Sequence, residues 1–153
     1  MRKMENNLQR FIDAQKSSYS VALGEIISGK KRSHWMWYIF PQIEGLGFSE
    51  LSMYYAIKSL QEAIDYSEHP ILGKRLIEIS TALLNLKSNN ATEVLGSPDD
   101  MKLRSCMSLF ASIPRADPVF EAVLKKFYND EMDERTLKII HKGVNDVKSN
   151  PGT

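Results

Sequence analysis

Signals for the start of an α-helix recur along this sequence from residue 59 onward and constrain its fold more than any other feature. Ser59 and Asn90 are each followed three residues later by a glutamate. This is the spacing of a capping box, in which side chains satisfy the unpaired N–H groups at a helix start. Three further predicted starts carry a proline, whose missing N–H costs nothing in the first helical turn: Pro70, Pro98 and Pro118.

Apolar residues after these starts recur every three or four positions, as on one face of a helix. The longest such series is Leu72, Leu76, Ile79, Leu83 and Leu86. Gly29, Gly96 and Gly143 stand at the expected helix ends, where glycine accepts a left-handed backbone. The spacing predicts one or two helices before Gly29, a short helix opening at Tyr54 and Tyr55, and further helices over 59–67, 70–86, 90–96, 98–112, 117–127 and 133–143.

In the segment from Ser33 to Phe40, the spacing of apolar residues does not distinguish a helix from a strand. Its positions are nearly all apolar or aromatic, so alternation carries no information about which side faces inward. A buried strand ending before Pro41 would fit the length, but no other segment offers a partner strand. We therefore predict a buried helix here.

Length and composition are those of one folded domain. With 153 residues and 42% hydrophobic residues, the chain can build a core without disulfides or metal. We expect an all-α, compact single-domain bundle of about seven to eight helices over residues 1–143, followed by a frayed tail over 144–153. The net charge of +1 gives no field to hold a polyanion, so a nucleic acid partner is not expected.

Cysteine content and hydropathy indicate a cytoplasmic protein. Cys106 is the only cysteine, so no internal disulfide can form, as is usual in a reducing compartment. Residues 1–15 carry charges where a signal peptide needs an apolar core, and no apolar run is long enough to cross a membrane. We expect neither a membrane partner nor a cofactor.

Several stretches together carry a family resemblance. They are Leu8-Gln-Arg-Phe11, Lys31-Arg-Ser-His-Trp-Met-Trp-Tyr-Ile-Phe-Pro-Gln42, Gly45-Leu-Gly47, Tyr55-Ala-Ile57, His69-Pro-Ile-Leu-Gly-Lys-Arg75, Ser97-Pro-Asp-Asp100 and Lys102-Leu-Arg-Ser105. On these residues the chain resembles an uncharacterised bacterial family often mislabelled calpastatin. The resemblance implies an all-helical single domain and no established activity. In size, helix content and mixed His, Trp and Arg composition, the chain is also similar to helical proteins that handle NAD-derived ADP-ribosides.

The densest candidate site lies between Lys30 and Trp37. Lys31, Ser33 and His34 adjoin two indoles at the start of an apolar segment. Backbone N–H groups at a helix start and nearby cations attract phosphate, and an indole can stack on a flat ring. In the competing interpretation, Trp35 and Trp37 are core residues and the cations lie in a solvated loop.

Two further features could extend this site. Gln42 follows Pro41 and precedes Gly45 and Gly47, so its amide could face a cavity from a loop that allows close backbone approach. A turn without a ligand explains these residues equally well. Of the tyrosine pair, one side chain is expected to point inward with its hydroxyl seeking a partner, and we take this to be Tyr55.

The three histidines differ in their expected roles. His34 is a candidate general base, although a structural hydrogen bond fits equally well. His69 precedes a helix start, where an imidazole commonly acts as a cap, and His141 receives no role. Their spacing matches no ligand motif, so no metal is expected.

Arg75 and Arg104 lie within strong helical patterns, where a guanidinium can reach a ligand phosphate or form a structural ion pair with Asp99, Asp100 or Glu78. The dipole at the start of a helix already explains both aspartates. Cys106 is expected to be a small buried residue rather than a nucleophile.

Two functions follow from these candidates. In the first, the protein binds or processes a phosphorylated or nucleotide-like anion, with ADP-ribose derivatives as one class; Lys31 and Arg75 hold anionic groups, Trp37 stacks, Gln42 orients and His34 exchanges a proton. In the second, it is a non-catalytic helical module that docks a partner protein through its aromatic segment, which requires an exposed apolar patch.

Overall fold

The computed structural model describes the backbone of residues 3–149 and the side chains of residues 8–142. Within this part of the chain the only regular elements are helices: α1 (Lys3–Ser28), α2 (Met36–Ile39), α3 (Glu50–Tyr55), α4 (Leu60–Glu68), α5 (Leu72–Leu84), α6 (Ala91–Leu95), α7 (Asp99–Ala111), α8 (Pro118–Tyr128) and α9 (Glu134–Ser149). The predicted all-α fold is confirmed. Nine helices are described in this range, against the seven to eight expected.

Side-chain caps begin most of these helices where the sequence predicted them. Ser59 accepts a hydrogen bond from the Glu62 N–H, and Asn90 accepts one from the Glu93 N–H. Asp117 caps α8 in the same way, and Nδ1 of His69 accepts from the N–H groups of residues 71 and 72 at the start of α5. The capping role predicted for His69 is confirmed.

Ser97, which precedes Pro98 and two aspartates, does not cap α7. Pro98 occupies the N-cap position of α7 and provides no side-chain cap. Within the first turn, Oδ1 of Asp100 accepts a hydrogen bond from the Met101 N–H. Asp99 and Asp100 fall in its first turn, where their charges suit the positive end of the helix dipole.

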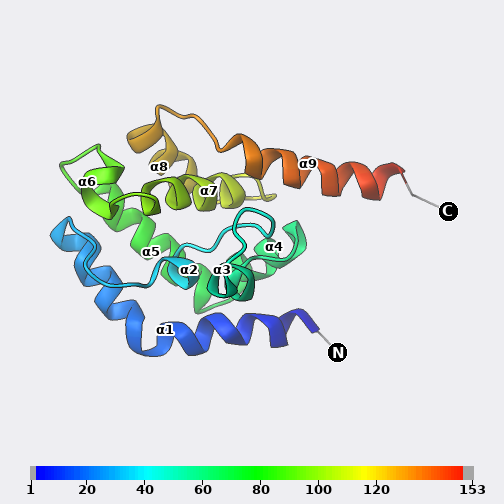
Figure 1. Ribbon diagram of the computed structural model, residues 1–153, viewed down its shortest axis with the longest axis horizontal. Helices are drawn as coiled ribbons and strands as arrows, with labels where there is room; N and C mark the ends of the chain where they lie inside the picture. Colours follow the sequence, from blue (N-terminus) through cyan, green and yellow to red (C-terminus); the bar gives the residue numbers. More distant parts are fainter. Residues whose placement is uncertain (1–2, 150–153) are drawn as a thin grey trace.

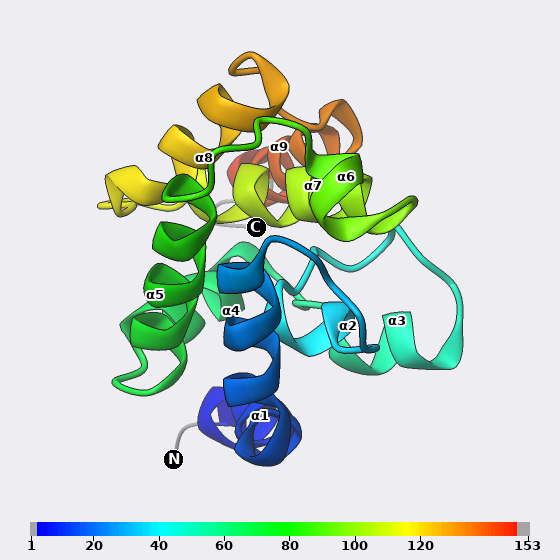
Figure 2. The ribbon, with the colours of Figure 1, turned by 90° about the vertical axis from the view of Figure 1, so that its left-hand side faces the viewer.

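The helices form two layers. Figure 1 shows α6 to α9 above α1 to α5, and the turned view in Figure 2 agrees. Aromatic side chains fill the space between the layers and run from one to the other. The ring of Phe11 lies 5.1 Å from Tyr66, Tyr66 lies 5.4 Å from Phe110, and Phe110 lies 5.8 Å from Phe120. This series joins α1, α4, α7 and α8 into one core.

The predicted helix from Ser33 to Phe40 is shorter in the structure. Only α2 is helical, because Trp35 already has an extended φ of −137° and Pro41 stops the helix after Phe40. The segment is nevertheless buried as expected, with Trp35 and Met36 each 1% exposed. Its approach to α2 is tied across the layers by a hydrogen bond from the Lys31 N–H to the Val94 carbonyl.

The last helix is longer than predicted. α9 passes Gly143 and continues to Ser149, so the predicted helix end was wrong by six residues. Residues 150–153 of the predicted tail lie outside the described residues, and the domain boundary at 143 remains a prediction.

Candidate functional site

A small hollow lies where the segment after α2 meets α3. It is lined by Trp37, Gln42, Ile43, Gly45, Leu46, Gly47, Ser52, Tyr55 and Ala56. Its volume of about 10 Å³ is roughly that of one water probe. Three of the predicted ligand-binding residues, Trp37, Gln42 and Tyr55, therefore meet at one place.

The polar ends of these three side chains have no hydrogen-bond partner among the described residues. Trp37 and Tyr55 contact other side chains through their rings, and the Gln42 amide has no hydrogen bond to a described residue. Their polar atoms are also not fully buried. In the described part of the chain, Oδ2 of Asp65 is the one fully buried side-chain polar atom that lacks a partner. The indole N–H, the amide and the phenol are thus open to a ligand or to water.

Tyr55 is suited to donate a hydrogen bond. Burial, reinforced by the neighbouring Tyr54, raises the pKa of its phenol above the ordinary value. The hydroxyl therefore keeps its proton at any physiological pH. Its ring is fixed by edge contact with Tyr54 at 4.8 Å and by Tyr38 at 5.2 Å.

A charged cluster adjoins the hollow on the side of α7. The Asp99 carboxylate forms ion pairs with the Lys31 ammonium at 3.0 Å and with the Lys102 ammonium at 3.5 Å. The two ammonium groups also lie over indoles, Lys31 over Trp35 at 5.1 Å and Lys102 over Trp37 at 5.0 Å. Two cations thus share one carboxylate, which leaves an excess of positive charge beside Trp37.

Ser33 serves a structural hub that the sequence did not reveal. The carboxylate of Glu25, near the end of α1, accepts hydrogen bonds from the Ser33 hydroxyl, the N–H groups of residues 32 and 33, and the Trp35 indole. Burial of Glu25 acts to raise its pKa, but these four bonds outweigh it and lower the pKa to about 2. Ser33 is therefore bound to Glu25 rather than to the hollow.

Arg75 does not join the hollow. Its guanidinium lies 5.0 Å from the ring centre of Tyr19 and donates to Oε1 of Gln15 at 3.3 Å. The amide of Gln15 donates in turn to the Tyr38 carbonyl and the Tyr66 hydroxyl. Arg75 thus supports the 31–42 segment through a buried glutamine instead of lining the same space.

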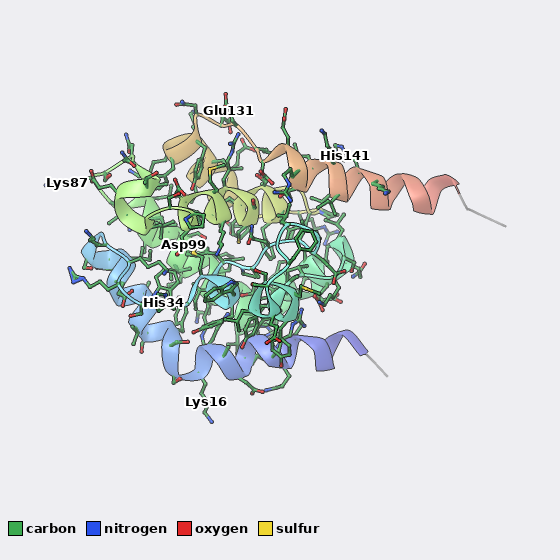
Figure 3. All side chains as sticks on the ribbon, in the orientation of Figure 1. Lys16, His34, Lys87, Asp99, Glu131 and His141 are labelled. Atoms are coloured by element: carbon green, nitrogen blue, oxygen red, sulfur yellow. The ribbon has the colours of Figure 1, made fainter. Side chains whose placement is uncertain are left out.

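His34 lies on the surface and also stays outside the hollow. Figure 3 shows it on the same side of the molecule as Asp99, while His141 lies far along α9. Only the backbone carbonyl of His34 is hydrogen-bonded, by the Tyr38 hydroxyl. The predicted convergence of His34 and Arg75 with Trp37 is wrong, because each is held by a different part of the fold. A general-base role for His34 remains a prediction.

Two buried polar residues that support the region around the hollow were not predicted from the sequence. Gln15 is 1% exposed and Glu62 is 0% exposed. Glu62 forms an ion pair with Arg10 at 2.9 Å. Its carboxylate also accepts a hydrogen bond from the Lys58 N–H, whereas in a capping box it would accept one from the N–H of residue 59. The available signal was a polar residue on an otherwise apolar helix face, since Gln15 continues the series Leu8, Phe11 and Ile12.

The remaining candidates are structural. Arg104 donates to the carbonyls of residues 131 and 132 and lies 3.7 Å from the Glu131 carboxylate, so none of its three predicted acidic partners is used. Cys106 is buried, as predicted, and burial raises the pKa of its thiol well above the ordinary value. Among residues with described side chains, no group of His, Cys, Asp and Glu could hold a metal ion.

None of the helices in the described range combines the length and apolar character required to cross a bilayer.

Comparison with known proteins places this fold in a family. The sequence model described as "Protein of unknown function (DUF1810)" matches residues 5–140. A crystal structure of the conserved hypothetical protein Rv1873 from Mycobacterium tuberculosis is 41% identical, covers 88% of this chain and 96% of its own, and superposes with a TM-score of 0.86. A comparison with curated proteins gives no match. The chain belongs to the DUF1810 family, a family of unknown function that shares this helical fold.

Proposed function

We propose that this protein binds a phosphorylated or nucleotide-like small molecule at the hollow formed by Trp37, Gln42 and Tyr55. One observation carries the proposal: three hydrogen-bonding side chains without a protein partner border the same small space. Polar groups that reach a hollow and stay unpaired are typical of sites that orient a ligand. ADP-ribose derivatives are one class of compound with the required chemistry.

The chemistry of the lining suits a flat heterocycle. A carboxamide both donates and accepts, so Gln42 can pair with the edge of a base, while Tyr55 and the Trp37 indole each supply a donor. Trp37 and Tyr55 also offer aromatic faces for stacking. These groups favour a ring with mixed donors and acceptors over an aliphatic ligand.

The neighbouring charges support an anionic group on that ligand. Lys31 and Lys102 together carry two positive charges against the single negative charge of Asp99. Lys102 is the more accessible of the two, with its side chain 24% exposed against 8% for Lys31. In this scheme Lys102 contacts the phosphate, and Lys31 holds Asp99 in place.

A thermal-shift screen against nucleotides, ADP-ribose and sugar phosphates tests the proposal. A ligand at 100 times its dissociation constant stabilises the fold by about 2.7 kcal/mol. We expect Tyr55→Phe and Gln42→Ala to reduce the shift caused by any hit. Tyr54→Phe is the matched control, because Tyr54 is exposed and lies outside the hollow. Hits that stabilise all variants as they stabilise the parent would contradict the site.

A second candidate function is a module that docks a partner protein. It is favoured by four large apolar side chains that are exposed close together in the sequence: Phe48 (79%), Leu51 (48%), Met53 (51%) and Tyr54 (57%). Exposed apolar groups gathered in one patch commonly mark an interaction surface. Trp35 cannot serve as its anchor, since it is 1% exposed.

Cross-linking mass spectrometry in cells that express the protein separates this candidate from the first. Docking predicts intermolecular cross-links close to residues 48–54 that disappear in Phe48→Ser and Leu51→Ser. Cross-links that persist in both variants, or none near this segment, would contradict docking through this patch.

A further inference from the structure

The segment from Glu44 to Ala56 leaves the body of the protein and returns to the same point. Its two ends are joined by a parallel bridge between Ile43 and Ile57. The Glu44 N–H donates to the Ile57 carbonyl at 2.8 Å, and the Ile57 N–H donates to the Gln42 carbonyl at 2.8 Å. Between these bonds the chain forms a loop with closed ends that contains α3, an arrangement often found in functional surface loops.

Of the large apolar residues in this loop, only Leu46 and Tyr55 pack against the core, and both are partly buried. α3 has no buried residue, and within residues 44–56 only Ala56 is buried. The two residues of the bridge, in contrast, belong to the core, with Ile43 4% and Ile57 0% exposed. Segments with few buried contacts open locally at a lower free energy than the core. The loop is therefore held less firmly than its two anchored ends.

Polar contacts fasten the closed position. Lys58 donates to the Met53 carbonyl at 2.8 Å and pairs with the Glu44 carboxylate at 3.2 Å, so it links both arms of the loop. Arg135 of α9 donates to the Leu46 carbonyl at 3.3 Å. Both side chains are on the surface, where such bonds exchange readily with water. Arg10 of α1 holds the C-terminal end of the loop more firmly, since it donates to the Tyr54 and Ala56 carbonyls at 2.8 Å each.

Close contact inside the loop depends on Gly47. A Cβ atom at this position would stand 2.8 Å from Oγ and 2.9 Å from Cβ of Ser52 in α3. The arm that carries Gly47 therefore closes directly onto α3, over the hollow that both border. A side chain at residue 47 would force the two arms apart.

We propose that residues 44–56 form a lid that hinges at Ile43 and Ile57 and opens to admit the ligand to the hollow. The inference rests on the proposed function, since the closed hollow of about 10 Å³ has no room for a nucleotide and one of its walls must move. Trp37 and Ile43 form the firm side of the hollow, and the loop forms the movable side. Lys58 is the latch on the two arms of the lid, while Arg10 holds its C-terminal end.

Hydrogen exchange followed by mass spectrometry, on the full chain without ligand, tests the lid. In the parent, amides of residues 44–56 should exchange well before those of α5 and α7. Lys58→Met removes the latch and should speed exchange in this segment up to about fivefold, as expected for the loss of an exposed charged contact. Lys74→Met is the control, since Lys74 is an exposed lysine of α5 outside the hollow.

Gly47→Ala and acrylamide quenching supply a second, independent readout. The alanine should speed exchange over residues 44–56, whereas Gly24→Ala should not, because nothing lies within 4 Å of a Cβ at Gly24. Quenching should rise in Lys58→Met and Gly47→Ala as Trp37 is uncovered, while Trp35 stays buried. Exchange of 44–56 as slow as that of α7, or faster exchange without added quenching, would overturn the lid. An opening lid with no hit in the ligand screen would instead refute the proposed function.

Discussion

Glu25 shows how one side chain organises the candidate region. Its four hydrogen bonds fix residues 32, 33 and 35, which lie seven to ten positions further along the chain. The carboxylate thereby holds the turn that leads from α1 into α2. Sequence patterns identified the serine and the indole as notable but gave no reason to connect them with Glu25, because the turn after Gly29 creates the contact.

The folded state should lose stability at acid pH through Glu25. The pKa of its carboxyl is about 2 in the folded protein, against an ordinary value of 4.5. A lowered folded pKa contributes stability that is present above pH 4.5 and is lost as the pH falls toward 2. Urea denaturation at pH 7 should find Glu25→Gln destabilised by about 1–2 kcal/mol, a range reduced for partial exposure.

The difference between Glu25→Gln and the parent should shrink as the pH approaches 2. Glu68→Gln, an exposed glutamate at the end of α4, serves as the control and should show no such convergence. A constant difference between parent and Glu25→Gln from pH 7 to pH 2 would contradict the ionised hub.

At the scale of elements, helix ends were predicted best where a local signal decides them. Ser59, Asn90 and Asp117 cap their helices as expected, because a cap requires only residues within three positions. α2 was predicted too long because apolar content alone does not locate a helix start, and α9 too short because a single glycine inside a helical pattern does not have to end it.

Two glycines, one after the end of α1 and one inside it, should respond in opposite ways to substitution by alanine. Gly29 follows α1 with a φ of +88°, while Gly24 lies inside the helix. Gly29→Ala should destabilise by about 1–2 kcal/mol, since alanine resists the left-handed region. Gly24→Ala should stabilise by roughly 0.5–1 kcal/mol through helix propensity. Thermal unfolding measures both, and shifts of the same sign would contradict this interpretation.

On the scale of the whole molecule, a line of aromatic rings joins the two layers. Phe110 stands near its middle, in ring contact with Tyr66 on one side and Phe120 on the other. Because these residues come from α4, α7 and α8, the layers should unfold together rather than one after the other.

Phe110→Ala should therefore cost about 3–5 kcal/mol and move the whole unfolding transition. Phe48→Ala removes a ring that is 79% exposed and should change stability by less than roughly 0.5 kcal/mol. Circular dichroism and tryptophan fluorescence should report coincident transitions for both variants. Separate transitions in Phe110→Ala would show that the layers are independent.

The sequence by itself determined the all-helical class, most helix starts, the buried state of Cys106 and the presence of Trp37, Gln42 and Tyr55 among the candidate site residues. These properties depend on period, capping and residue type, which act over a few positions. Tertiary structure alone decided that Arg75 hydrogen-bonds Gln15, that Lys31 and Lys102 share Asp99, and that Trp37, Gln42 and Tyr55 border one hollow. Those contacts join residues distant in the chain, and they form only when the helices pack and choose among several possible polar partners.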